Sequence, residues 1–509
     1  MKFLNSILSR IVLVVLALLI QIGWIAVMIL RLGNFIRYAN LILQIFSLLM
    51  VFYIAQRDTK ASFKLAWVVP ILLFPLFGGL IYLFFGTRSP TRGMKKKLEC
   101  SQAALKEHIP DSSATIEEIA TENASAGGQM RYLQNTGGFP VYQNTEARYF
   151  PLGEELFDVM LEELNKAERF IFLEFFIIAE GRMWNSVLEI LEEKVKQGVE
   201  VRVIYDDVGS LTTLPYDYNR QLEKKGIRCI SFNPFKPVLS IVMNNRDHRK
   251  IMVVDGKAGF TGGVNLADEY INEKLRYGHW KDTAVMLRGE AVRSLTLLFL
   301  EMWNAFRPGD SEIDRFLPDP PVLPSSASDG FVQPYGDSPL DGEPLAENVY
   351  LNIIHGAKRY VYICTPYLII DEELEGALTL AAKRGVDVRL ITPAIPDKKS
   401  AHALTRSHYP KLLSGGVKIY EYTPGFIHAK SFVCDDEIAT VGTVNLDYRS
   451  LYLHFECGVY FYRSSLVADV KRDFLETQEK CAPAKAQRHR FGMIRGLYHA
   501  ILRLFAPLF

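Results

Sequence analysis

The sequence predicts an α/β protein in which apolar N-terminal helices precede two repeated domains. Apolar runs within residues 1–90 predict the helices. A strand–helix–strand pattern that occurs twice in the rest of the chain predicts the repeat. A histidine and lysine motif that also occurs twice predicts that the two domains meet about a pseudo-twofold axis and share one site.

The composition excludes several classes of protein. The chain has 509 residues, with 58 Lys and Arg against 57 Asp and Glu, and a net charge of +1. A hydrophobic fraction of 49% argues against whole-chain disorder. The balanced charge argues against a protein that binds nucleic acid through a broad basic surface. The six cysteines form no C-x-x-C pair, so they indicate neither a disulfide framework nor a zinc site.

Three apolar runs predict a membrane anchor over residues 1–90. They are Ile11–Leu30, Leu41–Ala55 and Leu65–Phe85. The first run carries no charge and is long enough to cross the ~30 Å hydrocarbon core as a helix. A cleaved signal peptide is the alternative, but the run is long for one and no cleavage site precedes Arg31. We therefore expect two to three transmembrane helices.

The basic residues that flank these runs predict their orientation. The densest cluster, from Arg88 to Lys97, follows the third run. Because cytoplasmic loops carry an excess of Lys and Arg, the remainder of the chain is expected on the cytoplasmic side.

Composition also predicts the domain boundaries. Residues 101–130 are poor in aromatic residues and rich in Ser, Ala, Glu and Gly, which indicates a linker over 91–130. A Pro- and Ser-rich stretch indicates a second linker over 318–344. The repeated domains are expected over 131–317 and 345–482. Residues 483–509 predict a basic amphipathic helix, suited either to an anionic membrane surface or to docking on a domain.

The repeat is visible element by element. In the first copy a buried strand over 167–178 is followed by a helix over 184–197 and a strand over 198–205. The second copy has the same order, with elements over 357–370, 373–384 and 385–392. A glycine ends each helix, as expected for βαβ units. Each copy is therefore predicted to be a mixed sheet covered by helices.

The residues that could take part in catalysis or binding repeat as well. Both copies read H-x-K-x4-D-x6-G-[GT]-x-N. The motif residues are His248, Lys250, Asp255 and Asn265 in the first copy, and His428, Lys430, Asp435 and Asn445 in the second. Two such matches inside a repeat are not plausibly accidental.

The spacing of the motif favours a phosphate site. Histidine and lysine two residues apart on a strand face the same side, so two copies would bring two imidazoles and two ammonium groups together. Metal binding is the rival interpretation, but a lysine beside each histidine opposes a cation, so we expect neither metal nor cofactor. The lysines suit an anion with non-bridging oxygens, and Asn265 and Asn445 can donate further hydrogen bonds.

Two histidines around a phosphate suggest covalent catalysis. One imidazole attacks phosphorus, and the other protonates the leaving alcohol and then deprotonates the incoming one. A carboxylate on the second ring nitrogen would orient each histidine. Asp282 is the candidate for His248 and Glu456 the candidate for His428, with an ordinary surface or salt-bridged acid as the alternative for each.

The motif aspartates have two possible roles. Asp255 and Asp435 belong to the predicted catalytic motif, but both stand at strand ends before turns. Structural hydrogen bonding is therefore the favoured role for them.

The double motif resembles the phospholipase D superfamily, and the wider sequence resembles the bacterial cardiolipin synthases of that superfamily. The resemblance covers the chain from about Ala39 to its C-terminus. The supporting runs are residues 66–70, 79–86, 245–251, 260–266, 280–283, 365–367, 426–430 and 441–450. Thr443 and His454 depart from the residues usual in that family.

The resemblance implies a function. Two phosphatidylglycerol molecules would give cardiolipin and glycerol through a phosphohistidine on His248, with His428 as general acid and base. Phosphatidylglycerol and the lipid bilayer would be the partners, at the bacterial plasma membrane, with no nucleic acid and no obligatory protein partner. The resemblance leaves open four alternatives: a hydrolase, a transferase that uses another headgroup, a nuclease and a non-catalytic scaffold. The predicted membrane anchor and the near-zero net charge disfavour the nuclease. The two intact motifs disfavour the scaffold.

Overall fold

The computed structural model describes residues 18–23, 35–86, 92–235, 244–310, 312–319, 330–485 and 492–508. The chain divides into two compact units. The smaller unit comprises Met1–Pro90, Phe235–Asn245 and Arg490–Phe509, and the larger comprises Thr91–Pro234 and Arg246–His489.

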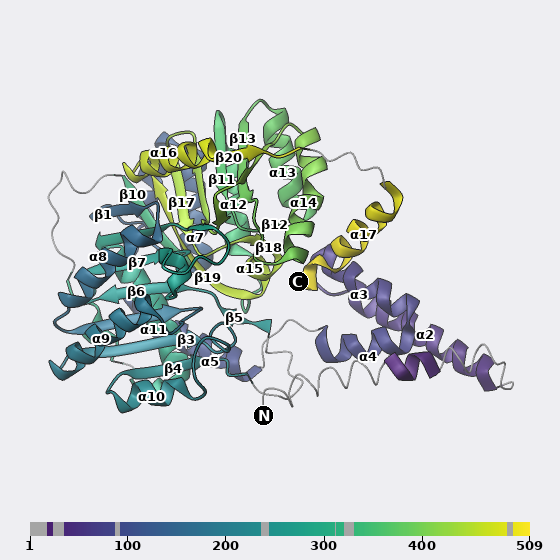
Figure 1. The fold of residues 1–509 in the computed structure, drawn as a ribbon, viewed down its shortest axis with the longest axis horizontal. Helices are drawn as coiled ribbons and strands as arrows, with labels where there is room; N and C mark the ends of the chain where they lie inside the picture. Colours follow the sequence, from purple (N-terminus) through teal and green to yellow (C-terminus); the bar gives the residue numbers. More distant parts are fainter. Residues whose placement is uncertain are drawn as a thin grey trace. The chain divides into compact units, whose positions relative to one another are not determined.

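Two β-sheets form the centre of the larger unit (Figure 1), and the second repeats the strand order of the first and adds the strand β20 at one edge. In order across the first sheet, the strands are β1 (Thr145–Phe150), β9 (Ala284–Gly289), β7 (Ala258–Gly262), β6 (Lys250–Val254), β2 (Phe170–Phe175), β3 (Glu200–Asp206) and β4 (Arg228–Phe232). In order across the second, they are β10 (Phe331–Asp337), β19 (His454–Tyr462), β17 (Ile438–Gly442), β16 (Ser431–Cys434), β11 (Tyr360–Cys364), β13 (Asp387–Pro393), β14 (Lys418–Tyr422) and β20 (Cys481–Pro483).

The strand directions repeat along with the order. β2, β3 and β4 are parallel, and so are β11, β13 and β14. The remaining central strands, β6, β7 and β9 in the first sheet and β16, β17 and β19 in the second, are antiparallel. These sheets confirm the predicted pair of repeated α/β domains.

Helices cover both faces of the first sheet. α8 (Gly153–Asn165) and α9 (Arg182–Lys196) share a hydrophobic core with the side chains of β2 that point to one face, such as Ile171 and Leu173. On the opposite face Phe172 stacks on Phe299 of α11 (Val292–Phe306), with ring centroids 4.3 Å apart. Alternate side chains of a strand face opposite sides, so each face needs its own layer of helices.

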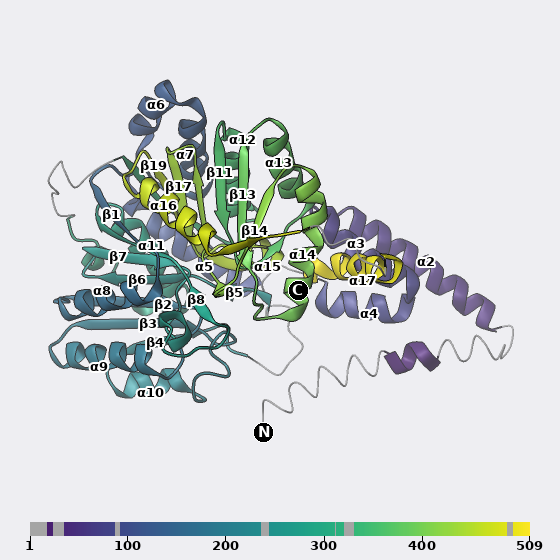
Figure 2. The ribbon, with the colours of Figure 1, turned by 45° about the horizontal axis from the view of Figure 1, so that its top comes forward.

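The second sheet is covered in the same way. α12 (Leu345–Gly356), α13 (Glu372–Lys383) and α14 (Lys399–Ser414) contribute to its main core. Tyr362 of β11 points to the other face and stacks on Phe474 of α16 (Leu466–Glu479), at 4.8 Å between centroids. Figure 2 shows α16 crossing that sheet.

Residues 91–130 are helical, which differs from the expected linker. They contain α5 (Arg92–Leu105), η1 (Lys106–His108), α6 (Ser113–Glu122) and the start of α7 (Ala124–Gly137). The small residues that suggested a linker allow close helix packing instead: a Cβ on Gly127 would lie 2.5 Å from the Cα of Ala120. β10 likewise falls inside the second predicted linker, 318–344, so that break is shorter than expected.

The helices of the smaller unit do not confirm the predicted two to three transmembrane helices. α2 (Phe35–Ala55) contains the second apolar run, but the third run forms two short helices, α3 (Ala61–Leu73) and α4 (Pro75–Phe85). The break falls at Phe74 because Pro75 restricts the residue before it and donates no backbone hydrogen bond. Of the first run, only residues 18–23 are among the described residues. No helix in the described part of the chain is long and apolar enough to span a membrane.

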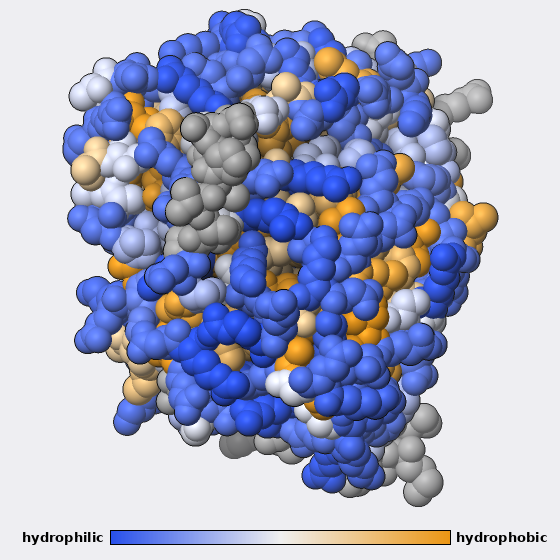
Figure 3. All heavy atoms as spheres, turned by 90° about the vertical axis from the view of Figure 1, so that its left-hand side faces the viewer, coloured by the Kyte–Doolittle hydropathy of each residue, from blue (hydrophilic) through white to orange (hydrophobic). Residues whose placement is uncertain are grey.

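The surfaces of the molecule differ in polarity. The face drawn in Figure 3 carries mostly hydrophilic side chains, with scattered hydrophobic areas. α2, by contrast, exposes a series of large apolar side chains, including Ile42 at 66%, Leu49 at 63% and Phe52 at 58%. The C-terminal helix α17 (Gly492–Phe505) contributes Leu497 and Ile501 to the exposed apolar residues of this unit.

Candidate active site

The two halves of the larger unit exchange backbone contacts at the motif histidines. His248 follows the short strand β5 (Arg246–Asp247), which pairs in parallel with the start of β19. His428 follows β15 (Gly425–Ile427), which pairs in parallel with β8 (His279–Lys281). The backbone N–H of His248 donates to Phe455 O at 2.9 Å, and that of His428 donates to Lys281 O at 2.7 Å. Each histidine is therefore held by a strand of the opposite half.

This pairing places each histidine beside a carboxylate of the other half. His248 Nδ1 lies 2.9 Å from Glu456 Oε2, and His428 Nδ1 lies 2.6 Å from Asp282 Oδ2. The two carboxylates are the predicted ones, but the predicted assignment within each half is wrong. In both parallel pairs the histidine and the carboxylate directly follow the last paired residues of their two strands, so they stand opposite each other. The strand pairing itself therefore produces the crossed contacts.

The carboxylates are held by different donors. Glu456 accepts hydrogen bonds from Ser450 Oγ, at 2.5 Å, and from Thr443 Oγ1. Asp282 Oδ1 accepts from the backbone N–H of Thr283 at 2.9 Å. Gly263 occupies the motif position of Thr443, and a Cβ there would lie 2.0 Å from Asp282 Oδ1. The first copy of the motif thus needs glycine at this position to admit its carboxylate.

The motif lysines are buried beside the histidines. Lys250 Nζ donates to His248 O at 2.5 Å, and Lys430 Nζ donates to His428 O. Lys430 Nζ also lies 2.8 Å from His428 Nδ1. Because the contact of Nδ1 to Asp282 is shorter, we assign a proton to Nδ1, which donates it in a hydrogen bond to the carboxylate. Burial lowers the pKa of Lys250 to about 8 and that of Lys430 to about 7, against the opposing effect of the nearby carboxylates.

Both imidazoles are neutral near pH 7 when no anion is bound. Burial, with further contributions from Lys250 and His454, holds the pKa of His248 well below its usual value. Burial and Lys430 lower the pKa of His428 to about 4, although Asp282 acts in the opposite direction. A neutral ring with its proton on Nδ1 carries a lone pair on Nε2, which can attack phosphorus or accept a proton.

The predicted phosphate-binding asparagines differ in their contacts. Asn265 Oδ1 accepts from the backbone N–H of Ile177 at 3.0 Å, and its Nδ2 donates to Tyr270 Oη at 2.7 Å. Both ends of Asn265 are thus engaged within the protein. Asn445 Oδ1 is buried and, among the described residues, has no hydrogen-bond partner.

The motif aspartates make structural hydrogen bonds to the backbone, which is the role that the sequence favoured for them. Asp255 accepts from the backbone N–H groups of residues 168–170, each at 2.8 Å. Asp435 accepts from those of residues 358–360, at 2.6 to 2.8 Å. Both occupy the left-handed region, with φ of 55° and 54°. Each aspartate fixes the entry to the central strand, β2 or β11.

Sequence reasoning did not identify several side chains around the histidines. Phe176 packs against His248 at 4.9 Å between ring centroids, and Tyr270 and Trp280 pack against His428 at 5.6 and 5.4 Å. Ser450, which donates to Glu456, carried no separate signal because a serine six residues before a glutamate is common. These side chains leave His248 and His428 only 6% and 7% exposed.

Among the described residues, two groups of side chains have the donor atoms to hold a metal ion. One consists of His248, His454 and Glu456, whose donor atoms lie within 4.8 Å of one another. The buried ammonium group of Lys250 stands beside this group and opposes a cation. The other consists of Glu347, Asp371 and Glu373.

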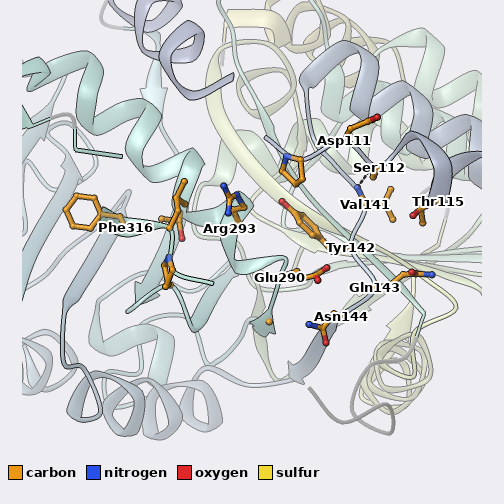
Figure 4. A pocket seen from close by; sticks show the side chains of 16 residues that line it. Asp111, Ser112, Thr115, Val141, Tyr142, Gln143, Asn144, Glu290, Arg293 and Phe316 are labelled. Atoms are coloured by element: carbon orange, nitrogen blue, oxygen red, sulfur yellow. Dashed lines mark hydrogen bonds between the residues drawn. The ribbon is translucent and has the colours of Figure 1, made fainter. Parts of the chain in front are cut away.

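Some of the described residues line cavities outside the histidine site. One, of about 440 Å³, has Tyr142, Glu290 and Arg293 among its lining residues (Figure 4), and none of the predicted site residues lines it. The other, of about 480 Å³, is lined in part by Arg249 and Phe455, the sequence neighbours of His248 and Glu456.

Comparisons with known proteins agree with this architecture. Residues 160–303 and 350–477 match the family model of the phospholipase D-like domain of cardiolipin synthase, and residues 42–86 match a phospholipase D and nuclease N-terminal model. A cardiolipin synthase of Geobacillus kaustophilus is 36% identical over 92% of this chain and 94% of its own. An uncharacterized protein of Streptococcus mutans is 47% identical over 90% of this chain and 99% of its own.

One solved structure supports the fold. The phosphatidylserine synthase of Haemophilus influenzae covers 75% of this chain and 98% of its own, with a TM-score of 0.56 and 17% identity. At that identity the likeness concerns the fold alone.

Proposed function

The chain belongs to the family of cardiolipin synthases with phospholipase D-like domains, and on this basis we propose that it joins two phosphatidylglycerol molecules into cardiolipin and releases glycerol. As a phosphatidyltransferase it exchanges one phosphodiester for another, so no nucleotide is needed to drive the reaction. The observation that carries the proposal is the pair of buried histidines from opposite halves, each with its Nδ1 beside a carboxylate.

In the first step, His248 Nε2 attacks the phosphorus of one phosphatidylglycerol. The bond from phosphorus to the glycerol oxygen breaks, and His428, protonated on Nε2, gives its proton to that oxygen. The bound phosphate is an anion and raises the proton affinity of His428 above that in the empty site. Lys250 and Lys430 stabilise the charge on the non-bridging oxygens.

In the second step, His428 Nε2 accepts the proton of a glycerol hydroxyl on the second phosphatidylglycerol. That hydroxyl oxygen attacks the phosphohistidine, the phosphorus–nitrogen bond breaks, and His248 returns to its neutral form. Cardiolipin leaves, and His428 ends the cycle protonated on Nε2, as it began.

The surroundings of the two rings support this division of roles. Burial and the cationic neighbours of His248 lower its pKa, which keeps its lone pair available for attack. Asp282 raises the proton affinity of His428, which suits a group that must carry a proton for part of the cycle. Asn265 and Asn445 complete the proposed phosphate site, Asn265 by fixing the adjacent backbone and Asn445 as a direct ligand.

We further propose that the smaller unit associates with the bacterial plasma membrane, with the catalytic unit in the cytoplasm as the flanking charges predict. The exposed apolar residues of α2 and the basic amphipathic α17 support membrane contact. Whether any segment crosses the bilayer is tested by protease protection in sealed vesicles, in which a multi-pass anchor would leave a fragment around α2 protected from either side.

The reaction is tested with purified protein in phosphatidylglycerol vesicles that contain a chelator and no CTP. We expect cardiolipin and glycerol in equal amounts. Phosphatidic acid in place of cardiolipin would identify a hydrolase and contradict the proposal, and no turnover would point to a different donor lipid.

A further inference from the structure

A third histidine lies beside the proposed nucleophile. His454, the first residue of β19, has its ring centroid 5.5 Å from that of His248, and Phe176 packs against both rings. One nitrogen of each histidine and one oxygen of Glu456 lie within 4.8 Å of one another. His454 is only 8% exposed.

The protonation of His454 follows from its contact with Arg449. Arg449 Nε donates to His454 Nε2 at 3.3 Å. Because a guanidinium group is always a donor, Nε2 must accept, and the ring proton of a neutral His454 lies on Nδ1. Burial, together with Arg449 and Arg246, holds the pKa of His454 well below its usual value, so the ring is neutral.

The Nδ1–H group of His454 is buried and, within the described part of the chain, has no hydrogen-bond partner. The nearest carboxylate oxygen, Glu456 Oε1, is 3.9 Å away and already accepts from Ser450. A buried donor without a partner is costly and indicates an acceptor that is absent when the site is empty. A metal ion does not fit, because ligation through Nδ1 would displace the proton while Arg449 still donates to Nε2.

On the basis of the function proposed above, we propose that His454 is an additional phosphate-binding residue, whose Nδ1–H donates to a non-bridging oxygen of the phosphoryl group on His248. The oxygens of that group are two bonds from the His248 nitrogen, and the ring of His454 lies beside that of His248. Lys250 and Lys430 supply charge, and His454 supplies a directional neutral donor whose tautomer Arg449 fixes.

Two polar substitutions test the role of Nδ1. In His454→Asn the side-chain amide can take the position of Nδ1, whereas in His454→Gln it reaches the position of Nε2. The probe is vanadate, which adopts the geometry of a phosphoryl group in transfer. For the full chain, we expect His454→Gln to raise the Kd for vanadate and to lower kcat/KM with phosphatidylglycerol, each by about tenfold to hundredfold. His454→Asn should leave both close to those of the unsubstituted protein.

The control is His355→Gln, an exposed histidine on α12, which should change neither quantity. Thermal unfolding shows whether each variant is folded. Equal losses in the Asn and Gln variants, or unchanged vanadate binding in His454→Gln, would overturn the proposal. Unchanged vanadate binding with a raised KM would assign His454 to the glycerol headgroup instead. The vanadate measurement needs no lipid, so a chain that fails to turn over phosphatidylglycerol would refute the proposed donor without affecting this test.

Discussion

At the scale of single residues, each motif histidine is completed by a carboxylate that the other half supplies. Glu456 orients His248 and Asp282 orients His428, and each contact lies at the end of a short parallel strand pair. A histidine whose Nδ1 proton is fixed in this way presents its Nε2 lone pair in one direction. The crossed contacts therefore decide which substitution impairs which chemical step.

Substitutions of the two carboxylates should affect nucleophilic attack and proton transfer to the leaving group separately. Asp282→Asn and Glu456→Gln should each lower turnover of phosphatidylglycerol by on the order of 10² to 10⁴-fold. With a phosphatidyl ester of nitrophenol, whose leaving group needs no proton, Asp282→Asn should form the covalent intermediate at close to the normal rate. Glu456→Gln should remain slow, because it impairs the nucleophile. Rapid-quench measurement of nitrophenol release checks this. If the nitrophenyl substrate restored the rate of Glu456→Gln and not that of Asp282→Asn, the crossed pairing would be contradicted and Glu456 would be assigned to His428.

The motif lysines predict the pH dependence. Their pKa values of about 8 for Lys250 and about 7 for Lys430 mean that both lose their charge in the empty site as the pH rises through this range. Phosphate binding weakens with that loss, so kcat/KM should fall as the pH rises from about 7 to 9. A bound phosphate anion raises the pKa of both lysines, so kcat should fall only at higher pH. Steady-state profiles check this, and a kcat/KM that rises over the interval would contradict it.

At the scale of elements, the loop after β7 must leave room for Asp282. A Cβ on Gly263 would overlap Asp282 Oδ1, so Gly263→Ala should displace the carboxylate and lower kcat by on the order of 10²-fold. Gly376→Ala on α13, where nothing lies within 4 Å of the added Cβ, is the matched control and should keep full activity. Activity assays with both variants test the loop, and full activity of Gly263→Ala would contradict the close approach of Asp282 to this loop.

The sequence anticipated much at this scale because strand and helix patterns are local. The βαβ order and the repeated motif identified both domains and the two histidines. The crossed carboxylates were not accessible in this way, because the register of β5 on β19 and of β8 on β15 joins residues far apart in the chain. Residues 91–130 were misjudged because small residues suit loops and closely packed helices equally. Pro75 ended a helix inside an apolar run that hydrophobicity alone presented as continuous.

At the scale of the whole molecule, one chain supplies both halves of the site. The second sheet repeats the strand order of the first, and the two strand pairs that join the halves, β5 with β19 and β8 with β15, both form within the larger unit. His248→Ala and His428→Ala should therefore each abolish transfer, and mixing the two variants should restore none of it. Cardiolipin formation in the mixture checks this expectation. Recovered activity would show that halves from different chains combine.

The most direct measurement is to locate the covalent intermediate. The full chain is mixed rapidly with phosphatidylglycerol labelled at phosphorus, quenched in base, which preserves phosphohistidine, and digested for mass spectrometry. We expect the phosphatidyl group on His248 in the unsubstituted protein, and its accumulation there in His428→Ala with the nitrophenyl substrate. Label on His428, or turnover without a covalent adduct on either histidine, would contradict the mechanism.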